Sequence, residues 1–196
     1  TVALPMARLL ASSGGAAAPL VFAKQGTGRL YYRARLAFAQ RELPRQALDH
    51  GLAVQRTVEV LDGAGRPVQP TRPPRLGDTV RISLQVRNGE TRRFVVIEDP
   101  LPAGFEAVDR SLAIESSAFG ADEAWGESER WDHQESRDDR VLFFRDELPA
   151  GTHHFRYLAR VNFAGEFLTP PLRAEEMYTP ELYGHGAAGR LTVPAR

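Results

Sequence analysis

The sequence predicts an all-β fold, an antiparallel β-sandwich with little helix. Short segments in which apolar and polar residues alternate recur along the 196 residues, and 17 glycines and 14 prolines punctuate them. A period of two is typical of strands that bury one face. By contrast, no segment keeps the i, i+3, i+4, i+7 apolar spacing of an amphipathic helix over three turns. We therefore expect roughly ten short strands packed around one core.

The composition excludes several classes of protein. Cysteine is absent, so the chain has no disulfide framework, no thiolate metal site and no cysteine nucleophile. The 25 basic and 25 acidic residues balance, and the basic ones are scattered, which argues against binding to nucleic acid. No apolar run reaches the roughly 18 residues of a membrane-spanning helix. Direct membrane insertion is therefore not expected.

The amino-terminal part predicts strands and then a linker. Residues 20–28 are typical of a strand followed by a glycine turn, and residues 30–38 alternate strictly, with arginines on the solvent face. The polar stretch 41–51 lacks alternation and contains a proline, which is typical of a linker. We therefore divide the chain into residues 1–44, the terminal strands of a preceding module plus a linker, and residues 45–196, the sandwich. The abrupt start and end favour a segment of a larger protein.

The sandwich begins with two strong strand patterns. Apolar residues alternate over 52–60, and the proline- and glycine-rich stretch 62–78 then predicts an exposed connection. The alternation over 80–87 is the cleanest in the chain. Asn88–Gly89 follows, a pair that tolerates positive φ at a hairpin turn, and residues 94–97 supply the returning strand.

One turn motif occurs twice, as D-P-L-P-A-G at 99–104 and D-E-L-P-A-G at 146–151. Each copy leaves one hydrophobic strand and enters another. Proline removes backbone donors there, and Gly104 is free to adopt a left-handed conformation. Leu101 and Leu148 are expected to point into the core, at strand ends of one sandwich.

Between the two copies, residues 115–139 are polar and acidic without periodicity. We interpret them as a long, mobile loop that Trp125 and Trp131 anchor in part. The alternating charges of Arg137–Arg140 lie just before a buried strand. A structural role, pinning this loop to the sheet, is favoured over a binding role.

The remaining strands follow from apolar patterns. Residues 141–144 predict a buried strand, and 153–163 give the longest alternation in the chain. Short strands around 166–168, 172–177 and 189–193 complete the sandwich.

Residues with catalytic or ligand-binding potential do not form a recognisable site. His153 and His154 are adjacent on a strand, so they point to opposite faces and cannot share a metal. His185 lies in a glycine-rich stretch that predicts a flexible loop. The acidic cluster at 122–129 lacks the ligand spacing of a calcium loop, and no nucleophile, phosphate or zinc motif is present. We therefore predict no catalytic, cofactor-binding or metal-binding residues, no cofactor and no enzymatic activity.

Several segments carry a family resemblance. They are GLAVQRTVEV (51–60), LGDTVRISLQV (76–86), FVVIEDPLPAGFE (94–106), RDDRVLFF (137–144), LPAGTHHFRYLARVNFAGEFLTPP (148–171) and RAEEMYTPELYGHGAAGRLTV (173–193). Together they resemble the last domain of bacterial α2-macroglobulins. The stretch 26–39 is similar to the junction strand entering that domain, so the resemblance covers about residues 20–193.

The resemblance implies a macroglobulin-like or Ig-like β-sandwich at the carboxyl end of a protease trap. In this family a bait region is cut, the molecule collapses, and a thioester in another domain captures the protease. Because this chain has no cysteine, that chemistry would lie elsewhere. The implied role is a non-catalytic structural and interaction domain that packs against neighbouring domains and moves with them on bait cleavage.

The resemblance also implies partners and a compartment. The partners are other domains of the same chain, target proteases through the whole molecule, and a cell-wall synthase. The location is the periplasm or the cell envelope, as a lipoprotein. Arginine-bearing faces around Arg33, Arg35, Arg81 and Arg87 are candidate contact surfaces, with solvated faces as the alternative.

Two other functions remain open. An Ig-like repeat of a bacterial surface protein or adhesin also uses D-x-L-P-x-G turns, although A-E-E-M-Y and the proline that follows favour the macroglobulin. A carbohydrate-binding or hydrolytic domain would need exposed aromatics or paired carboxylates, for which Trp125 and Trp131 are the candidates.

Overall fold

The computed structural model describes residues 3–8, 21–34, 42–69, 71–108, 128 and 130–195. The chain divides into two compact units, residues 1–42 and 43–196. In these described ranges no helix is long and apolar enough to cross a membrane.

In the first unit, the described residues contain one helical turn at 6–8 and no strand. The strands expected at 20–28 and 30–38 are therefore wrong over residues 21–34, and the rest of those two ranges lies outside the described residues. Alternation produces a strand only when a neighbouring backbone supplies hydrogen bonds, and no described strand pairs with this segment. The expected glycine turn is present, with positive φ at Gly26 and Gly28 and with Phe22 stacked on Tyr32.

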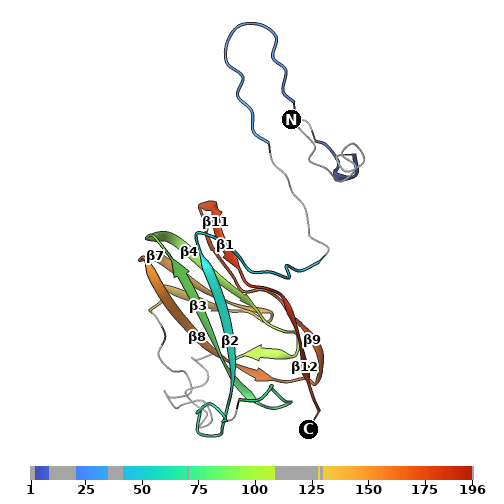
Figure 1. The fold of residues 1–196 in the computed structure, drawn as a ribbon, viewed down its shortest axis with the longest axis vertical. Coiled ribbons are helices and arrows are strands. Elements are labelled where there is room, and N and C mark those ends of the chain that lie inside the picture. Colours follow the sequence, from blue (N-terminus) through green and yellow to red (C-terminus); the bar gives the residue numbers. More distant parts are fainter. Residues whose placement is uncertain are drawn as a thin grey trace. The chain divides into compact units, whose positions relative to one another are not determined.

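The second unit is an antiparallel β-sandwich (Figure 1). Its strands are β1 (Leu48–His50), β2 (Ala53–Leu61), β3 (Thr79–Asn88), β4 (Arg92–Pro100), β5 (Phe105–Ala107), β6 (His133–Ser136), β7 (Arg140–Leu148), β8 (Gly151–Val161), β9 (Gly165–Thr169), β10 (Arg173–Glu176), β11 (Thr179–His185) and β12 (Gly189–Val193). One sheet has the order β1-β11-β10-β4-β7-β6, the other β2-β3-β8-β5, and β9 pairs with β12. The predicted all-β fold with little helix is confirmed.

The core lies between the two larger sheets and follows the predicted alternation. Every second residue is buried from Val80 to Val86 of β3 and from Phe155 to Val161 of β8, where Leu158 is buried as well, and this core includes buried residues of β4 and β7. The set comprises Val80, Ile82, Leu84, Val86, Val95, Ile97, Val141, Phe143, Phe155, Tyr157, Ala159 and Val161. The alternation of β8 ends at Val161, and Phe163 lies beyond the strand and is exposed.

Both copies of the repeated turn lie where the chain passes from the six-stranded sheet to the four-stranded sheet. The first joins β4 to β5 and the second joins β7 to β8. Leu101 and Leu148 are buried, so their predicted orientation is confirmed. Gly104 does not have positive φ, so it does not use the left-handed conformation that is open to glycine. A glycine fits there because a Cβ atom would lie 2.6 Å from the ring of Phe167.

The predicted hairpin at Asn88–Gly89 is wrong, because β3 and β4 belong to different sheets and neither residue has positive φ. The buried side chain of Asn88 instead ties the connection between β3 and β4 to the second repeated turn, between β7 and β8. Its amide nitrogen donates hydrogen bonds to the carbonyl oxygens of Glu90 at 2.7 Å, Leu148 at 3.2 Å and Pro149 at 2.8 Å. Carbonyls at such corners have left the strand ladder, and a side-chain donor satisfies them.

Three short or irregular strands were not predicted. The expected linker 41–51 contains β1, and the expected loop 115–139 contains β6, which pairs with β7. His185 ends β11 rather than lying in a loop. β1 and β6 are edge strands of three and four residues that are held by backbone pairing, so they leave no apolar alternation in the sequence. The expected mobility of 115–139 and the anchor Trp125 fall largely on residues outside the described ranges, whereas Trp131 packs against Phe143 at 5.6 Å.

Candidate functional site

The histidines do not converge. His153 and His154 follow one another on β8, and His153 Nε2 lies 2.8 Å from the carbonyl oxygen of Pro149. His185 pairs with Leu48 and Arg173 in the sheet. Across the described ranges, no three histidine, aspartate or glutamate side chains form a group that could hold a metal ion.

A buried charged network, formed by Arg56, Asp99 and Tyr157, crosses the sandwich. Arg56 Nη1 donates to Asp99 Oδ1 at 2.6 Å, and Tyr157 Oη donates to Asp99 Oδ2 at 2.6 Å. The side chain of Asp99 is 0% exposed and that of Arg56 15%. Arg56 also donates to the carbonyl oxygens of Pro100 at 3.3 Å and Pro170 at 2.9 Å. The network therefore links β2 and β8 of one sheet to the end of β4 in the other.

Burial dominates the electrostatics of this network. It raises the pKa of Asp99, while the Arg56 guanidinium and the Tyr157 hydroxyl act in the opposite direction. Burial and the Asp99 carboxylate together raise the pKa of Tyr157 well above its ordinary range. A raised carboxyl pKa is also typical of catalytic acids. Here each carboxylate oxygen accepts a hydrogen bond from within the protein, so the arrangement is suited to holding the two sheets together.

Sequence reasoning missed this network, although one signal was present. Arg56 occupies an inward position of the 52–60 alternation, between Val54 and Val58. It pairs across the strands with the buried Leu84, which places its side chain on the core face. An arginine at such a position needs a buried acid as a partner. The identity of that acid depends on the packing of β4 against β2, which the local sequence does not show.

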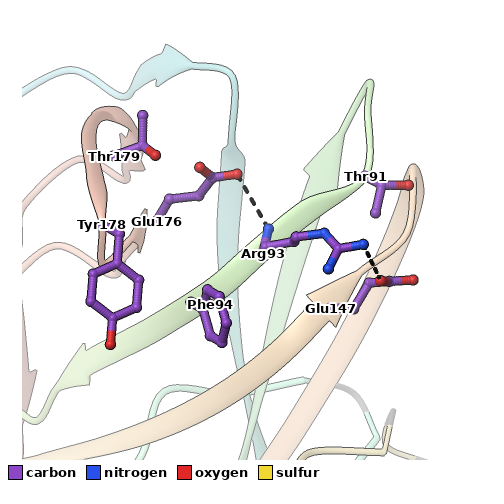
Figure 2. A pocket seen from close by; sticks show the side chains of 7 residues that line it. All are labelled: Thr91, Arg93, Phe94, Glu147, Glu176, Tyr178 and Thr179. Atoms are coloured by element: carbon purple, nitrogen blue, oxygen red, sulfur yellow. Dashed lines mark hydrogen bonds and ion pairs between the residues drawn. The ribbon is translucent and has the colours of Figure 1, made fainter.

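An exposed aromatic surface lies at the turn between β10 and β11 (Figure 2). The turn residues Met177 and Tyr178 are 42% and 78% exposed, and Phe94 of β4 is 43% exposed. The rings of Phe94 and Tyr178 meet edge to face, with centroids 5.2 Å apart and planes at 86°. We call these three residues the hairpin surface.

Polar side chains lie beside the hairpin surface (Figure 2). Arg93 Nη2 lies 3.2 Å from Glu147 Oε2, and the Arg93 backbone N–H donates to Glu176 Oε1 at 3.3 Å (Figure 2). With Thr91 and Thr179 these side chains line an open groove of about 610 Å³ beside the aromatic rings. Apolar side chains next to polar and charged ones are typical of protein contact surfaces.

The backbone at Phe94 is strained. Its φ is +52°, and it is the one non-glycine residue with positive φ in the described part of the chain. For a bulky residue this conformation costs about 1–3 kcal/mol and persists where the surrounding structure enforces it. Strain of this kind concentrates at functional positions.

The arginine faces predicted as contact surfaces are not brought together as one patch. Arg81 Nη2 is paired with Glu59 Oε2 at 3.0 Å, so its charge is balanced within the sheet. Arg87 is exposed on β3 and Arg33 is exposed in the first unit, whereas Arg35 lies outside the described residues. The hairpin surface is therefore a better candidate for a contact.

Arg137–Arg140 has the structural role that its charges predicted. Arg140 pairs with Glu98 of β4, and Arg137 Nη2 lies 2.6 Å from Glu135 Oε2 of β6. The backbone N–H of Leu101 donates to the carbonyl oxygen of Asp139 at 2.8 Å. The segment is thus fixed to the six-stranded sheet at the first repeated turn.

Comparison with known proteins agrees with this architecture. A family model described as the bacterial α2-macroglobulin MG10 domain matches residues 51–181. The α2-macroglobulin homolog of Nostoc is 32% identical over 120 residues, which cover 60% of this chain and 6% of that protein. A Dictyostelium discoideum protein named circularly permutated Ras protein 2 is 25% identical over 175 residues, covering 87% of this chain and 4% of that protein.

A solved structure shares the fold. The crystal structure of trypsin-activated α2-macroglobulin from Escherichia coli matches with a TM-score of 0.61 and 27% identity, over 76% of this chain and 11% of that chain. This chain thus spans 4% and 6% of the length of the two curated relatives described above. The resemblance seen in the sequence is confirmed, and the chain belongs to the bacterial α2-macroglobulin MG10 domain family.

Proposed function

We propose that this chain is a non-catalytic structural and interaction domain of a bacterial α2-macroglobulin-like, protease-trapping inhibitor. It packs against neighbouring domains of the same parent chain and moves with them when the bait region is cut. The hairpin surface is the observation that supports this proposal. The family match favours this role over an Ig-like repeat of a surface protein or adhesin.

Exposure and chemistry support a contact at the hairpin surface. Tyr178 presents 78% of its surface to solvent at the tip of a two-residue turn, next to Met177 and Phe94. Aromatic residues and methionine are enriched at protein interfaces, and adjacent exposed apolar side chains mark such sites. The partner that contacts the hairpin surface is another domain of the parent chain. This chain spans only 4% and 6% of the length of two relatives, so a protein of that size has many other domains that could contact it.

The hydrogen bonds inside the sandwich favour its movement as one rigid body. The buried network joins both sheets, and Asn88 ties the connection between β3 and β4 to the turn between β7 and β8. A domain locked in this way transmits displacement of a contact surface to its neighbours without deforming. We place such a protein in the periplasm or the cell envelope, with target proteases engaged by the whole molecule. The trypsin-activated relative supports that class of target.

The test uses the full-length protein that contains this domain. The double variant Met177→Ser/Tyr178→Ser removes the exposed turn residues, and Phe163→Ser/Leu168→Ser is the matched control at two other exposed apolar side chains. Trypsin is added, and compaction is followed by small-angle scattering together with retained activity on large and small substrates. We expect the first variant to lose the native arrangement and the trapping response, and the control to behave as wild type. Identical responses of the two variants and wild type would contradict the proposal.

A further inference from the structure

Phe94 combines a strained backbone with an exposed side chain. Its φ of +52° interrupts the ladder between β4 and β7, where Arg93 pairs with Glu147 and Val95 with Arg145 while Phe94 is unpaired. The register is the same on both sides, so no extra residue accounts for the interruption. The ring is 43% exposed and lies outside the buried core cluster. Neither core packing nor sheet pairing explains a phenylalanine in this conformation.

The contacts of Phe94 are directed at the turn between β10 and β11. Its carbonyl oxygen accepts a hydrogen bond from the backbone N–H of Met177 at 2.9 Å. Its ring meets the ring of Tyr178 at 5.2 Å and 86° (Figure 2). One residue thus holds both residues of the turn, one through the backbone and the other through the side chain.

The hairpin depends on this support because its own pairing is irregular. Between Glu175 and Glu176 the register with β11 shifts: Glu175 lies opposite Tyr183, whereas Glu176 lies opposite Thr179. Residues 180–182 therefore have no partner on β10. An irregularity of this kind bends the longer strand and re-aims the side chains beside it. The contacts of Phe94 with Met177 and Tyr178 act on this bent tip.

We propose that Phe94 is a positioning residue, whose left-handed conformation sets Met177 and Tyr178 in the orientation that a neighbouring domain contacts. That a neighbouring domain contacts these residues rests on the proposed function. That Phe94 positions Met177 and Tyr178 concerns this domain alone. A glycine at residue 94 would relieve the backbone strain and remove the ring at the same time. The strained phenylalanine serves the hairpin and is dispensable for the sandwich.

The first experiment tests positioning in the 196-residue chain. Wild type is compared with Phe94→Gly, with Phe94→Tyr, which keeps the ring, and with Phe163→Gly as a control at another exposed phenylalanine. Amide hydrogen exchange at Met177 and contacts of the Tyr178 ring are followed by NMR, and the midpoint of thermal unfolding is measured. We expect Phe94→Gly to speed exchange at Met177 about tenfold or more and to abolish ring contacts, with a midpoint equal to or above wild type. Phe94→Tyr and Phe163→Gly should leave the turn unchanged.

Two results would overturn the inference. Unchanged exchange at Met177 in Phe94→Gly would show that the turn is set by other contacts. A loss of protection throughout the sandwich would show that Phe94 is a general structural residue.

The second experiment separates this inference from the proposed function. In the full-length protein, Phe94→Gly and Tyr178→Ser are compared for compaction by trypsin. We expect both variants to impair it. Impairment by Tyr178→Ser alone would overturn the role of Phe94 and leave the contact surface intact. Normal compaction of both variants would refute the proposed function, while hairpin positioning would still be decided by the exchange data.

Discussion

Tyr157 Oη donates a 2.6 Å hydrogen bond to Asp99 Oδ2, and this bond joins the two sheets of the sandwich. Asp99 belongs to the first copy of the repeated turn, where the chain leaves the six-stranded sheet. Arg56 approaches the same carboxylate from β2, so three strands meet at one buried acid. Buried ion pairs add little net stability compared with apolar substitutes, but removing one partner is strongly destabilising.

Replacing Arg56 alone by methionine should destabilise the fold more than replacing both Arg56 and Asp99. Arg56→Met keeps an unbranched side chain but leaves the carboxylate of Asp99 buried without its cation, so we expect a loss of about 3–5 kcal/mol in the free energy of unfolding. Urea denaturation followed by circular dichroism measures it. The double variant Arg56→Met/Asp99→Asn should be less destabilised than the single variant, because no buried charge remains. A single variant within about 1 kcal/mol of wild type would contradict this role.

The hydroxyl of Tyr157 should matter for the same reason. Tyr157→Phe removes one donor to a charged group without changing the packing of the ring, and hydrogen bonds to charged groups contribute about 1.5–3 kcal/mol. Tyr178→Phe is the control, because it removes a hydroxyl from an exposed side chain and should be nearly neutral in the isolated chain. Equal unfolding midpoints of the two variants in urea would show that the bond to Asp99 does not stabilise the fold.

Asp99 also predicts a dependence of stability on pH. Burial raises its pKa in the folded state above the ordinary value of 3.8. At a pH between 3.8, its pKa in the unfolded chain, and its raised pKa in the folded state, Asp99 is protonated when folded and ionised when unfolded. The contribution of Asp99 to stability therefore falls as the pH rises through this range. The difference in unfolding free energy between wild type and Asp99→Asn should therefore be more favourable to wild type at about pH 4 than at about pH 7. If wild type instead becomes more stable relative to Asp99→Asn as the pH rises, the folded state lowers the pKa of Asp99.

The exposed carboxyls provide an internal comparison for that measurement. Hydrogen bonds from the Arg66 backbone and the Arg137 and Arg140 side chains lower the pKa values of Asp62, Glu135 and Asp139, respectively. Their contributions are present above the ordinary carboxyl range and are lost as the pH falls. They have the opposite sign to Asp99 and are common to wild type and Asp99→Asn, so they cancel in the difference.

The sequence pattern could predict the strands that contain regular apolar alternation. Val80 to Val86 of β3 and Phe155 to Val161 of β8 place every second residue in the core, and this alternation is visible in a single strand. The burial of Leu101 and Leu148 in the repeated turns was also predictable, because each is an apolar residue beside a strand that faces the core. That each turn changes sheet was not predictable, because a corner and a hairpin use the same turn residues.

The hairpin surface and the buried network depend on pairings that no local pattern contains. Phe94 looks like an ordinary strand residue, and its left-handed backbone is visible only with β7 on one side and β10 on the other. Pro180 and Gly184 disfavour a strand by propensity, yet β11 includes both. Tertiary contacts override the propensity there, because β11 is held between β1 and β10.

Gly184 offers the sharpest test of that override. Glycine-rich sequence around it predicts a flexible loop, in which alanine would be tolerated. In the structure a Cβ atom at Gly184 would lie 1.6 Å from the backbone oxygen of Leu52, which cannot move aside as a flexible side chain can. Gly184→Ala should therefore destabilise the domain by about 3 kcal/mol or more, at the upper end of overpacking effects. Gly89→Ala is the matched control, because it has open space around its Cβ position and no positive φ, and it should change stability by less than about 1 kcal/mol. If thermal unfolding finds the two variants equally stable, then Gly184 does not lie against the backbone of Leu52 as closely as in the structure.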